Sequence, residues 1–157
     1  MVFLRFLMLL SLVVWLGGIL FFAVLAPTTF SILPTRHLAG SVVGAMLSKL
    51  HWMGIIAGIV FLASSTIYSR LSTGDARLFG IRHILLCAML VLTLVSQFGI
   101  SPKMATLRRS MGEIDAVPMT DPARVQFNAL HMWSTRLEIG VLVLGLAVLY
   151  ITAHNFA

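Results

Sequence analysis

Four long apolar stretches, separated by short polar segments, run through almost the whole of this chain of 157 residues. A helix needs about 20 residues to cross the hydrocarbon core of a bilayer, and each stretch reaches that length with its flanks. Only 10% of the residues are charged, against about a quarter in a soluble domain. The pattern therefore predicts an all-α integral membrane protein, a four-helix bundle that forms a single domain over residues 1–157.

The ends of the spans can be placed from aromatic and basic residues, which settle at membrane boundaries. Tyr68 and Tyr150 indicate one boundary, and Trp52 and Trp133 the other. The expected helices cover residues 3–26, 38–70, 82–111 and 121–155. This count leaves the second, third and fourth helices extending beyond the bilayer on one side, while the connection over residues 71–80 on the other side is short.

Local signals indicate where the extended helices bend, end and begin. Pro102 is expected to kink the third helix, because proline cannot donate a backbone hydrogen bond. Gly112 can end that helix. Thr120 or Asp121 can cap the fourth helix, with Pro122 in its first turn.

Charge and motifs exclude several functions. The net charge of +6 suits residues that flank membrane spans and meet anionic headgroups, so we expect a lipid bilayer and no nucleic acid as partner. The sequence shows no nucleophile elbow, phosphate-binding loop or pair of carboxylates, and we expect no enzyme. Cys87 lies in an apolar run, one turn after His83, and is interpreted as an inert buried thiol.

The chain is expected in a bacterial inner membrane as a multi-pass protein with cytoplasmic N- and C-termini. Arg5 and the short loop with Arg70, Arg77 and Arg82 favour this orientation. The opposite end also carries many Lys and Arg residues, so the positive-inside rule favours the reverse. We expect the N-terminus inside, because the first span often determines the orientation.

Ionisable side chains near lipid usually face the bundle interior or water. Four ionisable residues fall near one boundary: His51, His131, Arg136 and Glu138. Together with Gln97, to which the pocket would reach down, they form the candidate ligand pocket. Helical spacing adds Ser48 beside His51, and places Thr93, Gln97 and Ser101 on one face of the third helix.

Two interpretations of these residues remain open. His51 and His131 could share a metal ion, with copper or haem as possible cofactors. Alternatively, Arg136 and Glu138 pair with each other or with backbone, and each histidine lies in the interface in contact with water. The sequence has no pair of histidines four residues apart on one helix, the usual spacing of metal ligands.

Glycines in the first two helices have a structural interpretation. Gly54 and Gly58 are four residues apart, a spacing that lets a neighbouring helix approach closely. The segment Trp15-Leu16-Gly17-Gly18 is interpreted in the same way.

Several short motifs carry a family resemblance that covers nearly the whole chain. They are Trp15-Leu16-Gly17-Gly18, Phe21-Phe22, Ala26-Pro27, Leu33-Pro34, Ala39-Gly40, Ile100-Ser101-Pro102-Lys103-Met104, Leu107-Arg108 and Leu130-His131. The chain resembles an uncharacterised bacterial four-span family related to eukaryotic transmembrane protein 205. Its opening Trp-Gly-Gly element is also similar to membrane domains of copper resistance protein D. The resemblance to the four-span family implies four helices. The similarity to copper resistance protein D adds weight to a metal site.

Three functional classes are compatible with these observations. The protein could bind or transport a small solute or metal ion in a polar pocket at one end of the bundle. It could be a structural or accessory subunit, as a homo-oligomer or in a larger membrane complex. It could also be a haem-binding redox protein. A pocket that reaches Gln97 favours the first class, whereas a closed apolar bundle with an exposed small-residue face favours the second.

Overall fold

The computed structural model describes residues 1–73 and 80–154, and within them the chain is helical and has no strand. The elements are α1 (Val2–Ile32), α2 (Arg36–Thr73), α3 (Ile81–Leu94), a π-helical segment η1 (Val95–Ile100), α4 (Ser101–Met111), a 3₁₀ turn η2 (Ile114–Ala116) and α5 (Pro122–His154). Four helical runs are long and apolar enough to cross a membrane. The third of them consists of α3, η1 and α4, which follow one another without a break. The predicted all-α four-helix bundle is confirmed. Most of the expected connection over residues 71–80, including Arg77, and residue 155 of the fourth helix lie outside the described residues.

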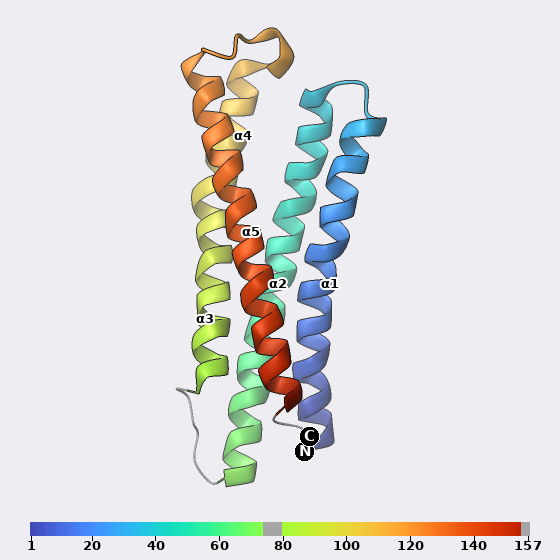
Figure 1. Ribbon diagram of the computed structural model, residues 1–157, viewed down its shortest axis with the longest axis vertical. Helices are drawn as coiled ribbons and strands as arrows, with labels where there is room; N and C mark the ends of the chain where they lie inside the picture. Colours follow the sequence, from blue (N-terminus) through green and yellow to red (C-terminus); the bar gives the residue numbers. More distant parts are fainter. Residues whose placement is uncertain (74–79, 155–157) are drawn as a thin grey trace.

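The four runs alternate in direction along the bundle (Figure 1). Helix α1 packs along α2, and α5 packs along α3. The turn over residues 33–35 and the segment over residues 112–121 lie at one end, here called the cap end, while the start of α1 and the end of α5 lie at the opposite, terminal end. The connection between α1 and α2 and the connection between α4 and α5 therefore lie at the same end of the bundle.

Helix α1 continues past its expected end at residue 26, through Pro27 to Ile32. Pro27 has no N–H and removes one intrahelical hydrogen bond. Beyond it, the Thr28 hydroxyl donates to the Val24 carbonyl and the Thr29 hydroxyl to the Leu25 carbonyl, each at 2.8 Å. These bonds add side-chain donors to the turn around Pro27, and the helix continues to Ile32 at the cap end.

The third run contains an extra residue just before Pro102. The Ser101 N–H donates to the Ser96 carbonyl, five residues back. Pro102 cannot donate to a preceding carbonyl, so the predicted kink takes the form of a local π-helical turn, a form common at functional sites. The predicted helix end at Gly112 is confirmed by its φ of 63°. The Asp121 carboxylate caps α5 by accepting from Ala123 N–H at 2.8 Å.

The core lies between the terminal end and the middle of the bundle. Its most enclosed side chains come from all four runs: Met8, Leu12, Trp15, Phe61, Leu86, Met89, Val141 and Val148. The Trp15 indole lies against the backbone of α2, where a Cβ at Gly54 would stand 2.4 Å from the indole Nε1. The predicted role of Gly54 in close helix approach is confirmed.

Cys87 does not belong to this core. Its side chain is exposed on the outer face of α3, so the interpretation as a buried thiol is wrong. The apolar neighbours in the sequence do not enclose it, because a membrane helix is apolar on its lipid-facing side as well as on its inner side.

Candidate functional site

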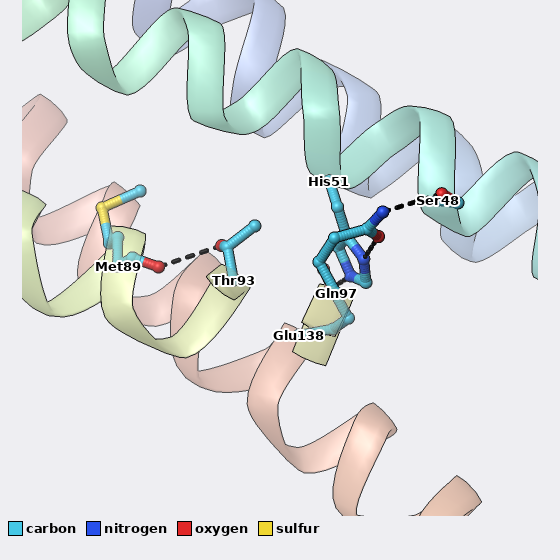
Figure 2. Close-up of polar contacts among 6 residues, drawn as sticks. All are labelled: Ser48, His51, Met89, Thr93, Gln97 and Glu138. Carbon is cyan, nitrogen blue, oxygen red and sulfur yellow. Dashed lines mark hydrogen bonds and ion pairs between the residues drawn. The ribbon is translucent and has the colours of Figure 1, made fainter. Parts of the chain in front are cut away.

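His51 is the centre of a polar cluster that joins three helical runs. Only 1% of its surface is exposed. Its Nδ1 lies 2.8 Å from the Gln97 Oε1, and its Nε2 lies 2.7 Å from the Glu138 Oε1. The Gln97 amide in turn donates from Nε2 to the Ser48 hydroxyl at 2.9 Å. Figure 2 shows the imidazole pointing from α2 between Gln97 on η1 and Glu138 on α5.

These contacts determine the number of protons in the cluster. With the amide oriented as in the structure, Gln97 Oε1 can only accept, so His51 Nδ1 carries a hydrogen. The Nε2 to Oε1 contact then holds one further proton, either on the imidazole or on the carboxyl group. In both cases the pair is neutral overall, which suits a site flanked by apolar helices, because an unpaired charge there is expensive.

The π-helical turn helps to bring Gln97 to His51. Thr93 lies four residues before Gln97 on the same run. It is 1% exposed, and its hydroxyl donates to the Met89 carbonyl of its own helix at 2.9 Å. Gln97 lies inside η1 and crosses to α2 instead, as Figure 2 shows. The extra residue shifts the helical register at the level where the cluster forms.

A cleft of about 440 Å³ lies on the cap side of this cluster, between α2 and the run of η1 and α4. Ser48 and Gln97 line its inner part, so the cluster forms part of the cleft wall. The lining residues are His37, Ser41, Gly44, Ala45, Leu47, Ser48, Gln97, Ser101, Pro102, Met104, Ala105, Arg108 and Arg109. Three of them are basic or imidazole side chains, and none is Asp or Glu.

Arg108 is a half-buried cation in the wall of this cleft. Its guanidinium carbon lies 5.5 Å from the centroid of the Phe127 ring on α5, an attractive cation–π distance. On the α2 side the group fits against glycine backbone, since a Cβ at Gly40 would stand 3.2 Å from Nε and one at Gly44 3.1 Å from Nη1. Among the described residues no carboxylate pairs with Arg108, and its buried Nε has no acceptor.

The structure brings together three of the five predicted pocket residues. His51, Gln97 and Glu138 are in contact. His131 and Arg136 are exposed on α5, and the Arg136 guanidinium lies over the outward-facing Trp133 ring, 5.5 Å from its centroid. The expected convergence of His131 on His51 is therefore wrong.

The metal site predicted from His51 and His131 is not formed in the described part of the chain. Both ring nitrogens of His51 are already within hydrogen-bond distance of side chains. Residues 1–73 and 80–154 hold no group of three His, Cys, Asp or Glu side chains that could bind a metal ion. The physical reason is distance along α5: His131 lies seven residues, or about 10 Å, from Glu138 toward the cap end, and its side chain is exposed there.

Two cleft residues, His37 and Arg108, are absent from the pocket that the sequence predicts. The sequence does hold a signal for Arg108, because Thr93, Gln97 and Ser101 form a stripe that reaches Arg108 seven residues later. The predicted pocket stops at the membrane boundary and so leaves Arg108 out. Nothing in the sequence marks His37, whose Nδ1 is buried without a partner among the described residues.

Comparison with known proteins gives a family and no function. A family model described as a domain of unknown function (DUF4149) matches residues 10–113, which contain His51, Gln97 and Arg108 but not Glu138. No curated protein and no solved structure matches the chain. The resemblances to relatives of transmembrane protein 205 and to copper resistance protein D stay predictions. Because the match spans more than half of a chain with four membrane-length helices, this integral membrane protein belongs to the DUF4149 family.

Proposed function

We propose that this protein binds a small anionic solute in the cleft at the cap end, with Arg108 as the principal partner of the anion. The observation that carries the proposal is the half-buried guanidinium of Arg108, which lies in the wall of an open cleft and has no carboxylate partner among the described residues. Guanidinium groups bind carboxylates and oxyanions through paired hydrogen bonds. A bound anion would supply the acceptor that the protein itself does not provide.

The rest of the lining supports an anion rather than a cation. His37 and Arg109 add positive or proton-donating groups, and Ser41, Ser48 and Ser101 add hydroxyls. The Ser48 oxygen accepts from Gln97, so its own hydrogen is free to point into the cleft. A volume of about 440 Å³ is within the range of small-molecule sites.

The alternatives differ in their support. Two glycines, Gly17 and Gly99, have nothing within 4 Å of the position of a Cβ, and such open small-residue sites suit packing against another helix. A role as an accessory subunit of a larger complex therefore keeps a specific observation in its favour. The haem alternative loses its predicted ligand, because both ring nitrogens of His51 are within hydrogen-bond distance of side chains. The cleft reaches Gln97, and this favours the binding of a small solute over the other two classes of function.

Replacing Arg108 with glutamine tests the proposed anion site. Because a hydrogen bond to a charged group contributes about 1.5–3 kcal/mol, we expect binding of sulfate, phosphate or succinate to weaken by about ten- to a hundredfold. Calorimetry on the detergent-purified protein measures this. Lys103→Gln is the matched control, since Lys103 is an exposed cation on the same helix outside the cleft lining. Equal affinity in wild type and Arg108→Gln, or no binding of any of these anions by folded wild type, contradicts the proposal.

We propose the bacterial inner membrane as the location, with both termini in the cytoplasm. The start of α1 and the end of α5 lie at one end of the bundle, so they must share a side if all four runs cross. In a Cys87→Ser background, a cysteine in place of Asp115 should react with a membrane-impermeant maleimide added outside spheroplasts, while a reporter after residue 157 reports the cytoplasm. The reverse pattern would support the opposite orientation, which the number of Lys and Arg residues at the cap end favours.

A further inference from the structure

A second group of buried polar side chains lies near the terminal end of the bundle. Ser65 on α2 and Thr152 on α5 are fully buried, and His83 on α3 is 5% exposed. The Ser65 Oγ, the Thr152 Oγ1 and both ring nitrogens of His83 have no hydrogen-bond partner in the part of the chain that the structure describes. Four unpartnered polar atoms on three helices are unusual, because nearly all buried polar groups in proteins are paired.

The register of the bundle places these three residues at one depth. The contacts of His51 with Gln97 and Glu138 align α2, η1 and α5. Ser65 and Thr152 lie fourteen residues beyond His51 and Glu138, and His83 lies fourteen residues before Gln97. Fourteen residues are close to four helical turns, or about 21 Å. Each residue therefore lies near the inward face of its helix and at the same level as the other two.

We propose that Ser65, His83 and Thr152 form a second polar site that holds ordered water. An imidazole always carries at least one N–H and the hydroxyls each carry one O–H, so the site needs a molecule that both donates and accepts. Water does both and typically makes about three hydrogen bonds in such positions.

Other ligands fit these residues less well. The described residues offer no cluster of three His, Cys, Asp or Glu for a metal ion. Hydroxyl groups and an imidazole suit a small neutral molecule instead. The site is independent of the proposed anion cleft, which is lined by none of these three residues.

The two polar levels are separated by an apolar layer. Between them lie Phe61, Leu86, Met89 and Val148, all with no exposed surface. Water or a proton at His83 would therefore communicate with the terminal side of the membrane, and the His51 pair with the cap side. The apolar layer is the barrier between the two.

Water transfer to the imidazole tests the site directly. In solid-state NMR of the protein in bilayers, labelled with ¹⁵N in histidine and tryptophan, magnetisation from water should reach the His83 ring nitrogens at a rate comparable with that for the exposed His131. The buried Trp15 indole, 2% exposed, serves as the dry control, and loss of the signal in His83→Phe assigns it. Transfer to His83 as slow as transfer to Trp15 overturns the proposal.

A pair of near-isosteric substitutions gives a second test. If water bridges the three residues, Ser65→Ala and Thr152→Val should each lower the SDS fraction at the unfolding midpoint, and the double variant should lose less than the sum of the two because both remove one network. If the site is dry, each substitution removes an unpaired polar group and raises the midpoint. Raised or strictly additive midpoints would overturn the shared water site.

Discussion

Replacing His51 with leucine is expected to lower the free energy of unfolding of the bundle by about 3–5 kcal/mol, the cost of removing one partner of a buried ion pair. Leucine fills a similar volume, so the loss comes from polar groups and not from a cavity. Glu138 would keep an unpaired carboxyl group, and the Gln97 Oε1 would lose its donor. Reversible unfolding in mixed micelles, followed by circular dichroism against SDS fraction, measures the change.

The double variant His51→Leu/Glu138→Leu separates pairing from packing. When both members of a buried pair become apolar, the stability often returns to the original value or higher. We expect the double variant to recover most of the loss, apart from the part due to the unpaired Gln97. A single variant as stable as wild type would mean that the pair contributes nothing to the fold. A double variant no better than the single one would locate the loss elsewhere.

The second large effect is expected at Gly54, where alanine should destabilise the bundle by about 1–3 kcal/mol, as overpacking of a tight core does. A Cβ at this position would stand 2.4 Å from Nε1 and 2.7 Å from Cε2 of the Trp15 indole. The indole is a rigid ring with only 2% of its surface exposed, so it cannot move aside without separating α1 from α2. The shift in SDS midpoint and in melting temperature reports the effect.

Gly17→Ala is the matched control, because it makes the same chemical change on the neighbouring helix. No atom lies within 4 Å of the position that its Cβ would take. Alanine has the higher helix propensity, by about 1 kcal/mol in exposed helix interiors, so stability should stay constant or rise. Equal losses at Gly17 and Gly54 would show that close packing against Trp15 is not the cause. If Gly17→Ala instead disrupts an assembly in the membrane, this supports the accessory-subunit alternative.

The architecture follows from the length of the apolar stretches. Apolar length alone predicts four membrane-crossing helices, because a bilayer demands about 20 apolar residues per span and a fully hydrogen-bonded backbone. Local chemistry also locates helix ends at Gly112 and Asp121, since a positive φ and a side-chain cap are properties of a few neighbouring residues. Pro27 is the exception. Proline weakens a helix without always ending it, and the hydroxyls of the two threonines that follow add bonds to carbonyls of the preceding turn.

Depth in the membrane is also predictable from the residue count along each span, and it places His51, Gln97 and Glu138 at one level. Which side chains at that level meet depends on tertiary packing. Contact requires the right rotation of each helix about its axis. For α2 that rotation follows from the packing of Trp15 on Gly54, and for the third run it depends on the π-helical turn that carries Gln97. His131 is excluded by its position along α5 instead, because it lies seven residues, or about 10 Å, nearer the cap end than Glu138. Arg108 joins the cleft because glycines on α2 and a ring on α5, distant in sequence, leave room for its guanidinium.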